Sequence, residues 1–282
     1  MRISSSGGRS YALAANISLL FTEVDLLDRP AAAAAAGFEA VESWWPFNGP
    51  APAASDVDAF VSAVEDAGVA LTGMNLYAGD MPSGERGVLS DPSRVDEFAT
   101  ALRVAADVAG RTGCAGFNAL YGQRIAGMDP DAQDRTATAN LTRAVRVLGD
   151  LGGVVLIEPL SRGLNGAYPL ESAADALAVV HRVREASGRD AIAFLFDTFH
   201  LANNGEDLSE VIRRYVVDIG HVQLADAPGR GEPGSGTIDF EAVLDGLSEA
   251  GYTGTVALEY APTSTTETSL AMLSTVNPAM PR

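Results

Sequence analysis

The chain repeats one phrase: a helical segment, a small residue, a glycine and then a short apolar run rich in β-branched residues. Four instances are AAAGFEAVE, EDAGVALTGMN, GDLGGVVLIE and SEAGYTGTVALE. Glycine after the last helical turn is a common helix end, and a run of about four apolar residues suits a strand that is buried on both faces. The phrase therefore predicts helices that alternate with parallel strands.

Eight strand–helix pairs follow one another along the 282 residues. The predicted strands are Leu13–Ile17, Ala40–Ser43, Ala70–Asn75, Gly116–Leu120, Val154–Ile157, Ile192–Phe196, His221–Leu224 and Thr255–Leu258. The predicted helices are Glu23–Ala36, Asp56–Ala67, Pro92–Gly110, Pro130–Leu151, Leu170–Ala186, Asp207–Tyr215, Asp239–Ala250 and Thr265–Leu273. This pattern predicts an α/β protein built as a single (β/α)8 TIM barrel. The alternative is an open doubly wound sheet, but no predicted strand is followed by its GxGxxG mark.

The predicted domain layout is a flexible leader (1–10), one barrel domain (11–275) and a C-terminal tail (276–282). With 47% hydrophobic residues, the chain has the composition of a globular protein. No segment approaches the roughly 20 apolar residues that a membrane helix needs, so no membrane partner is expected. The one cysteine, Cys114, cannot form an internal disulfide. It is expected to be a packed thiol, which fits a cytoplasmic protein.

The charge composition excludes several classes of function. Against 37 acidic residues there are 19 basic ones, which gives a net charge of −18. Such a chain is not expected to bind nucleic acid or an anionic membrane as its main partner. All of the basic residues are arginine, so chemistry that needs a lysine Schiff base or a Walker-type phosphate loop is excluded.

Polar side chains stand in or directly after most of the predicted strands, where a barrel carries its chemistry. They are Glu42, Asn75, Glu158, Asp197, Gln223 and Glu259. Carboxylates that are buried close together must hold protons or share a cation. Three carboxylates and an amide are hard oxygen ligands, which suit Mg²⁺ or Mn²⁺. The alternative interpretation is that these residues are scattered loop acids that face water.

Several motifs, in order along the chain, carry a resemblance to a known family. They are IEP at Ile157–Pro159, DTFH at Asp197–His200, GHVQLAD followed by PGRGEPGSG, and LEY at Leu258–Tyr260. Together they resemble hydroxypyruvate isomerases, which belong to the xylose isomerase-like barrel superfamily with sugar epimerases and related isomerases. The segments ANISLLFTEV, AGFEAVESWWPF and NLYAGDMPSGERG resemble the first three strand–loop units of that family. The resemblance covers nearly the whole chain, from Ala14 to Ala261.

The resemblance implies a role for individual residues. It places two catalytic glutamates at Glu158 and Glu259, and the superfamily's metal positions at Glu158, Asp197, Gln223 and Glu259. Gln223 stands where epimerase relatives tend to carry a histidine. The substrate-binding positions are expected at the following residues: His200, Arg230, Arg86, Asn75 and Glu42. Arg86 is the candidate to hold a substrate carboxylate through a bidentate pair.

The implied reaction is an aldose–ketose isomerisation of a sugar acid through a cis-enediolate, with one carboxylate removing a proton and a second group returning it to the next carbon. After Glu158 the chain reads PLSRGLNGAY, with Ser161 where the family tends to have asparagine and no arginine one residue after Arg162. The exact substrate therefore stays open. A 2-oxo-tetronate isomerase, a ketose 3-epimerase and a non-catalytic sugar-binding barrel are the alternatives.

A DNA-repair endonuclease of the same superfamily is disfavoured by the charge and by the presence of only three histidines. Of these, His181 is expected at the surface, His221 in a buried hydrogen bond and His200 in the pocket. Trp44 and Trp45 are expected either in the core or in one wall of the site. The expected partner is a small sugar acid or ketose, and a homo-oligomer is possible.

Overall fold

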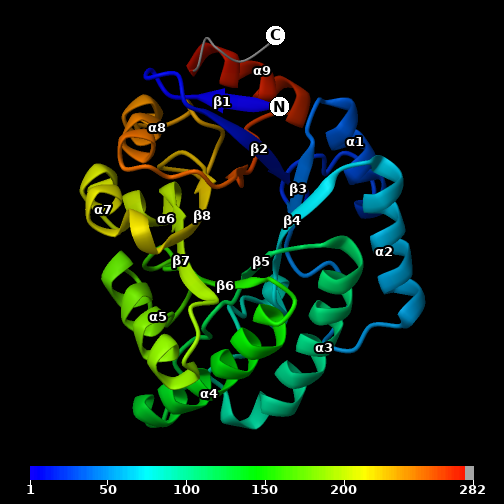
Figure 1. The fold of residues 1–282 in the computed structure, drawn as a ribbon, viewed down its shortest axis with the longest axis vertical. Helices are drawn as coiled ribbons and strands as arrows, with labels where there is room; N and C mark the ends of the chain where they lie inside the picture. The colour runs from blue at the N-terminus through cyan, green and yellow to red at the C-terminus, as the bar shows by residue number, and fades with distance from the viewer. Residues whose placement is uncertain (277–282) are drawn as a thin grey trace.

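The computed structural model describes residues 1–276 and shows a closed parallel barrel. In Figure 1 its strands form a ring around the centre of the molecule, with helices outside the ring. The barrel strands are β2 Ser10–Asn16, β3 Ala40–Ser43, β4 Ala70–Asn75, β5 Gly116–Asn118, β6 Val154–Ile157, β7 Ile192–Asp197, β8 Ile219–Leu224 and β9 Val256–Leu258. Each strand pairs with the next, and β2 also pairs with β9, so the sheet closes on itself. The predicted (β/α)8 barrel is confirmed.

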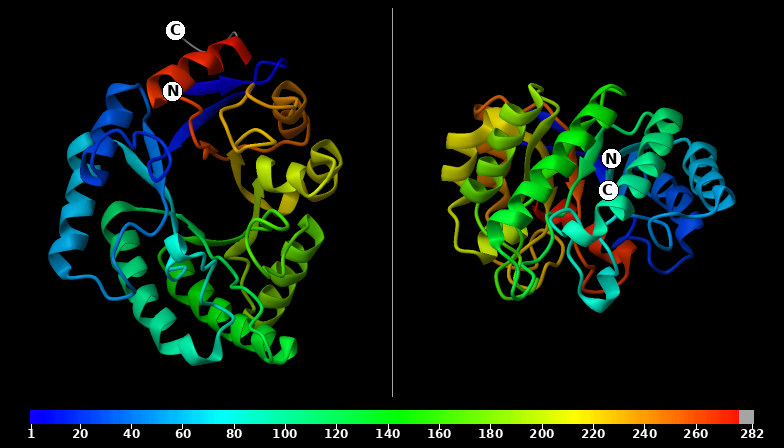
Figure 2. Two further views of the ribbon diagram at one scale, coloured as in Figure 1. Left: turned by 180° about the vertical axis from the view of Figure 1, so that it is seen from behind. Right: turned by 90° about the horizontal axis from the view of Figure 1, so that it is seen from below.

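Helices cover the outside of the barrel in both further views (Figure 2). They are α1 Arg29–Ala35, α2 Ala54–Ala67, α3 Val95–Thr112, α4 Pro130–Gly149, α5 Ala173–Ser187, α6 Thr198–Asn203, α7 Leu208–Tyr215, α8 Phe240–Glu249 and α9 Thr266–Val276. Short 3-10 turns occur at Leu26–Asp28, Met81–Ser83, Pro92–Arg94 and Val216–Asp218. Within residues 1–276, no helix combines the length and the apolar character that crossing a bilayer requires.

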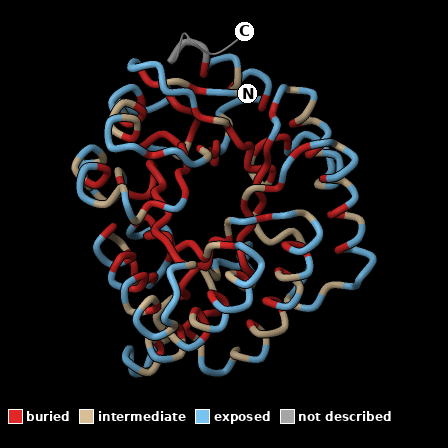
Figure 3. Tube along the Cα trace, in the orientation of Figure 1, coloured by how far each residue is buried: buried red, intermediate tan, exposed pale blue. Residues whose placement is uncertain are grey.

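The core lies between the strands and the inner faces of the helices, and the exposed residues lie on the outer turns (Figure 3). Gly68 ends α2 as the repeated phrase predicts, and Gly113 and Gly188 end α3 and α5 in the same way, with φ values of 68°, 73° and 68°. These are left-handed conformations, which glycine adopts without a steric penalty. Cys114 is a buried free thiol at the start of β5, as expected.

Two N-terminal segments differ from the sequence-based expectation. The first helix was expected from Glu23, but α1 begins at Arg29 and has Pro30 in its first turn. Proline lacks an N–H and clashes with the preceding turn, so it fits the first turn of a helix and not its interior. In place of a flexible leader, Arg2–Ser4 form β1, which pairs antiparallel with β2 and buries Ile3. Of the predicted tail 276–282, all but the first residue lies outside the described part of the chain.

Candidate active site

Four polar residues from neighbouring strands meet at the carboxyl end of the barrel. Asp197 ends β7, and Gln223 on β8 is its register partner. Glu158 follows β6 directly, and Glu259 follows β9. All four side chains are buried, with relative exposures of 0% to 3%. The strand ends thus place three carboxyl groups and an amide out of water.

Glu259 is surrounded by hydrogen-bond donors. Its Oε1 accepts from Asn16 Nδ2 at 3.0 Å and from Trp44 Nε1 at 2.7 Å, and its Oε2 accepts from Arg230 Nη2. Burial raises the pKa of Glu259 to about 7, although the charge of Arg230 opposes this and that of Asp197 adds to it. A carboxylate with such a pKa can take up a proton near neutral pH.

Glu158 has a different environment from Glu259. Its Oε2 accepts from Asn118 Nδ2 at 2.7 Å, whereas its Oε1 is buried and has no partner. Burial, together with the charges of Glu259 and Asp197, raises the pKa of Glu158 well above its usual value. In the absence of a nearby cation, Glu158 therefore holds a proton more readily than an exposed glutamate does.

His200 is fixed in one tautomer by the loop after β6. The backbone N–H of Ser161 donates to His200 Nδ1 at 2.9 Å, and the Ser161 hydroxyl lies 2.8 Å from the same nitrogen. Burial and the charges of Arg230 and Arg86 hold the pKa of His200 well below its usual value, so the ring is neutral. Because Nδ1 accepts, the proton lies on Nε2, which is 3.6 Å from Glu158 Oε1. His200 thus presents an N–H donor toward Glu158.

The loop after β8 holds Arg230 in the site. Asp226 organises this loop by accepting from the backbone N–H groups of Ala227, Gly234, Gly236 and Ile238. Arg230 has a left-handed φ of 59°, which is uncommon outside glycine, and its carbonyl accepts from the Ala261 N–H at 2.8 Å. In this conformation Arg230 Nη2 contacts Glu259 and lies 3.8 Å from Asp197 Oδ2.

Arg86 is anchored on the loop after β4. Its Nε donates to Asn165 Oδ1, and its Nη1 donates to the carbonyls of Met81 and Glu85. The next residue, Gly87, has a φ of 110°, and a Cβ there would lie 2.1 Å from the Leu120 carbonyl, so glycine lets the two loops pack closely. Burial and the charge of Arg230 lower the pKa of Arg86. Nη2 is therefore the nitrogen of Arg86 that can bind a ligand. A bidentate pair in which Nε and Nη2 both donate to one carboxylate is not available, because Nε already donates to Asn165.

A cavity of about 670 Å³ opens beside these residues at the mouth of the barrel. Trp44 and Arg86 line it next to the carboxylates, and Trp45 and Tyr77 form an edge-to-face pair farther out, with ring centroids 5.9 Å apart. Trp44, which also bonds Glu259, is thus part of a wall of the site. The tryptophans were expected either here or in the core.

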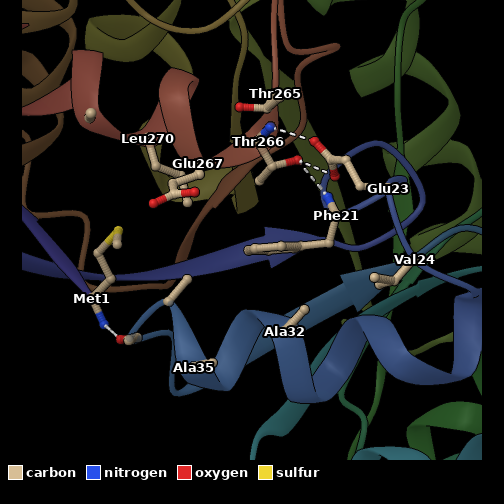
Figure 4. Close-up of a pocket in the computed structure, with 13 residues that line it drawn as sticks. Met1, Phe21, Glu23, Val24, Ala32, Ala35, Thr265, Thr266, Glu267 and Leu270 are labelled. Atoms are coloured by element: carbon tan, nitrogen blue, oxygen red, sulfur yellow. Dashed lines mark hydrogen bonds between the residues drawn. The ribbon is translucent and has the colours of Figure 1, made fainter.

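A larger cavity, of about 1000 Å³, lies elsewhere, between α1 and α9 on the outside of the barrel (Figure 4). Its lining is mostly alanine and other apolar residues. The carboxylate of Glu23, at its edge, is already hydrogen-bonded to Thr266. Trp44, which bonds Glu259, and Arg86, whose pKa the charge of Arg230 lowers, line the cavity of about 670 Å³ and not this one. We therefore place the candidate active site at the barrel mouth.

The site has the features of a cation site. Among residues 1–276, three of the four predicted metal ligands have a buried oxygen without a hydrogen-bond partner: Glu158 Oε1, Asp197 Oδ2 and Gln223 Oε1. Within the described residues, ligand atoms of Glu158, Asp197 and His200 lie within 4.8 Å of one another. Burying carboxylate oxygens close together without hydrogen-bond partners costs free energy unless a cation binds them. Such oxygen ligands suit a hard divalent ion. Glu158, Asp197 and Gln223 could therefore hold one. Both oxygens of Glu259 already have donors.

Glu42 and Asn75 lie deeper in the barrel, where they line a small cavity of about 10 Å³ with Gln223. Glu42 Oε1 accepts from Gln223 Nε2 at 2.7 Å and from Asn16 Nδ2 at 2.9 Å, and Oε2 lies 2.7 Å from His221 Nε2. Burial acts to raise the pKa of Glu42, but these partners outweigh it and the pKa is lowered. His221 is thus a buried hydrogen-bonding residue, as predicted, and His181 is exposed on α5.

Two residues of the site were missed in the sequence. Asn16 ends β2 and Asn118 ends β5, and they donate to Glu259 and Glu158. Both carry the signal that identified the other residues, which is a polar side chain at the end of an apolar strand. Asn118 was missed because its strand was predicted to continue to Leu120 and ends two residues earlier.

Comparison with known proteins agrees with this architecture. Residues 30–276 match the model of the family described as xylose isomerase-like TIM barrel. A putative hydroxypyruvate isomerase from Streptomyces coelicolor is 53% identical over 88% of this chain and 89% of its own length. The hydroxypyruvate isomerase of Escherichia coli is 31% identical, with 91% and 95% covered. The 2-oxo-tetronate isomerase of Haemophilus influenzae is 32% identical, with 91% and 96% covered.

Among solved structures, a Brucella melitensis protein described as an AP endonuclease of family 2 superposes with a TM-score of 0.84. It is 30% identical, and the match covers 95% of this chain and 99% of that one. The matched lengths are nearly complete for each of these proteins, and the sequence motifs lie at the strand ends that form the site. The chain therefore belongs to the xylose isomerase-like TIM barrel family and, within it, to the hydroxypyruvate isomerases.

Proposed function

We propose that this chain is a sugar-acid isomerase that interconverts hydroxypyruvate and tartronate semialdehyde. The observation that carries the proposal is the pair of buried glutamates, Glu158 and Glu259, at the ends of β6 and β9 beside Arg230. Both have a raised pKa, which is how active sites adapt carboxyl groups to proton transfer near neutral pH. The names of the relatives support the reaction class. We further place the enzyme in the cytoplasm, because its one cysteine is a buried free thiol.

The reaction moves one proton between adjacent carbons. A base removes a proton from C3 of hydroxypyruvate, the electrons form a C2–C3 double bond, and the C2 oxygen becomes an enediolate oxyanion. A proton is then delivered to C2, and the proton of the C3 hydroxyl passes to the C2 oxygen, so that C3 becomes the aldehyde and C2 carries the hydroxyl group. We assign the first transfer to Glu259, because N–H donors hold it as a carboxylate, and the second to Glu158.

Two N–H donors are available for the oxyanion. His200 offers Nε2–H, and Arg230 offers its guanidinium group beside Asp197. Such fixed donors, in a site that excludes water, stabilise charge that develops in the transition state. A divalent cation held by Glu158, Asp197 and Gln223 would add electrostatic stabilisation of the same negative charge.

The proposed substrate is an anion, and the protein as a whole, at −18, repels anions. A local pair of arginines offsets this field. Arg86 and Arg230 come from the loops after β4 and β8 and are close enough for the charge of Arg230 to lower the pKa of Arg86. Arg230 already pairs with Glu259 and Asp197, so we place the substrate carboxylate at Nη2 of Arg86.

The test compares how Arg86→Lys changes the KM for an anionic substrate and the KM for a neutral one. This change keeps the positive charge but loses the contacts that aim Nη2, so the KM for hydroxypyruvate should rise about 10-fold or more. The KM for a neutral ketose should scarcely change. Arg213→Lys, at an exposed arginine that pairs with Glu210 on α7, is the matched control and should change neither value.

Steady-state kinetics on both substrates provides the measurement. If the wild type prefers neutral ketoses, or if Arg86→Lys affects both substrates alike, the site is not built for a carboxylate and the ketose 3-epimerase function replaces the one proposed. A 2-oxo-tetronate is the second candidate substrate, because the cavity of about 670 Å³ has room for more than three carbons. The ratio of the kcat/KM values for hydroxypyruvate and 2-oxo-tetronates decides between the two acids.

A further inference from the structure

We propose that Glu42 is a positioning residue that makes the Gln223 amide turn its oxygen, and not its nitrogen, toward the candidate cation site. The two ends of an amide differ in chemistry: the oxygen can bind a cation, whereas the NH2 group cannot. The inference rests on the cation site of the proposed function, and it concerns a residue that does not itself touch the cation.

The hydrogen bonds of Gln223 show how its amide is oriented. Its Nε2 donates to Glu42 Oε1 at 2.7 Å, while its Oε1 is buried and has no partner. A carboxylate can only accept hydrogen bonds, so it can be satisfied only by the NH2 end of the amide. The Gln223 oxygen therefore faces away from Glu42, toward Asp197. Asp197 is the register partner of Gln223, and its Oδ2 also has no hydrogen-bond partner.

Glu42 is itself held in place by two further donors. His221 Nε2 lies 2.7 Å from its second oxygen, and Asn16 Nδ2 donates to the same oxygen as Gln223. The orientation of the Asn16 amide is fixed because its Oδ1 accepts from the Ser18 backbone N–H at 3.0 Å. Three donors from two strands, β2 and β8, thus converge on one buried carboxylate and hold it in place.

The same network reaches the proposed base. Asn16 Nδ2 donates both to Glu42 and to Glu259 Oε1, at 2.9 Å and 3.0 Å. Glu42 thereby helps to position one candidate ligand directly and one reacting group through Asn16. A residue of this kind acts through others, and loss of such outer partners typically weakens metal binding about 10- to 100-fold.

The experiment measures Mn²⁺ affinity by titration calorimetry on the full chain. Glu42→Gln keeps the shape of the side chain but turns an acceptor into an amide that can also donate, so Gln223 is free to rotate. We expect the Kd for Mn²⁺ to rise about 10- to 100-fold. Asp218→Asn is the matched control, because Asp218 is a carboxylate paired with Arg184 just before β8, at the opposite end of the barrel. It should leave the Kd unchanged.

The reversed pair, Glu42→Gln with Gln223→Glu, separates positioning from general structural support. It keeps one carboxylate and one amide but exchanges their strands. The amide at position 42 on β3 now donates the hydrogen bond, and the carboxylate at position 223 on β8 turns an oxygen toward the cation site in either orientation. We expect its Kd for Mn²⁺ to return to within about threefold of wild type. The pair also covers the case in which Glu42→Gln alone does not fold.

The outcomes are distinct. An unchanged Kd in Glu42→Gln overturns the inference, and so does a reversed pair that folds, as circular dichroism shows, but binds Mn²⁺ as weakly as the single variant. If the wild type binds no Mn²⁺, the inference fails together with the cation site. In that case the turnover of hydroxypyruvate by the wild type, measured separately, shows whether the proposed reaction stands.

Discussion

Glu158→Gln and Glu259→Gln should each lower kcat by at least about 100-fold, the low end of the effect of a lost general acid or base. Glutamine has the size of glutamate but cannot carry a proton between two carbons. Asn16 and Trp44 would still find an acceptor in the oxygen of glutamine at position 259, so two of the three hydrogen bonds of Glu259 should persist. Steady-state kinetics on hydroxypyruvate gives kcat, and circular dichroism shows whether the barrel is intact.

Asp218→Asn serves as the control here too, because it removes a partly buried carboxylate far from the reacting groups. Its kcat should equal that of the wild type. A folded Glu158→Gln or Glu259→Gln protein with a kcat near the wild-type value would mean that the residue takes no part in proton transfer. The division of roles between β6 and β9 would then be wrong.

Removing divalent ions should lower activity, and it should also destabilise the protein in a way that depends on pH. Glu158, Asp197 and Glu259 all have a folded-state pKa above the unfolded value because of burial. Such a group contributes stability that is present below the unfolded pKa and is lost as the pH rises through the folded pKa. For Glu259 this window runs from the usual glutamate pKa of 4.5 to a pKa of about 7.

The size of the effect follows from the shift. One pKa unit corresponds to about 1.4 kcal/mol, so Glu259 alone contributes on the order of 3 kcal/mol between these limits. The unfolding free energy of the protein in the presence of a chelator should therefore fall from pH 4.5 to pH 7.5. Carboxylates whose pKa is lowered by a salt bridge would have the opposite effect and make the unfolding free energy rise with pH. Mn²⁺ should restore the stability at pH 7.5 and have little effect at pH 4.5, because a cation favours the ionised form of its ligands.

Thermal unfolding of chelated and Mn²⁺-loaded protein at the two pH values checks this expectation. Glu259→Gln should reduce the pH dependence of the chelated protein, because it removes one of the titrating groups. Full activity with no divalent ion bound, as shown by elemental analysis, would contradict the cation site. The enediolate would then be stabilised by the N–H donors of His200 and Arg230 alone.

The barrel could be predicted from the sequence because its signals are local. A glycine after a helix and a short apolar strand identify one unit without reference to any other, and eight such units leave few alternatives. The start of α1 was harder to place, since the residues before Pro30 include helix formers such as Glu23 and Leu26. Pro30 was the better guide there, because its missing N–H restricts it to the first turn.

The site was only partly predictable, for the opposite reason. Glu158, Asp197, Gln223 and Glu259 stand at strand ends and match family motifs, so each could be named on its own. Their partners depend on how the barrel closes: Asn16 meets Glu259 across 243 residues of sequence, and Glu42 meets Gln223 across 181. Glu42 was expected to contact substrate, and the structure surrounds it with three protein donors.

Ser161 illustrates the same limit. The sequence showed only that a serine stands where the family tends to have asparagine. The structure shows that both its backbone N–H and its hydroxyl contact His200 Nδ1. A substitution at this position therefore keeps the backbone N–H contact with His200 and changes the side-chain contact.

The central claim is that a proton, and not a hydride, moves between the two carbons. Turnover of hydroxypyruvate in D2O, followed by NMR, tests it most directly. A proton carried by Glu158 or Glu259 exchanges with solvent, so tartronate semialdehyde should carry deuterium at C2 after turnover by the wild type and not after incubation with Glu259→Gln. Product that retains only protium at C2, at full turnover, would contradict the account, because a direct hydride shift never exposes the transferred hydrogen to water.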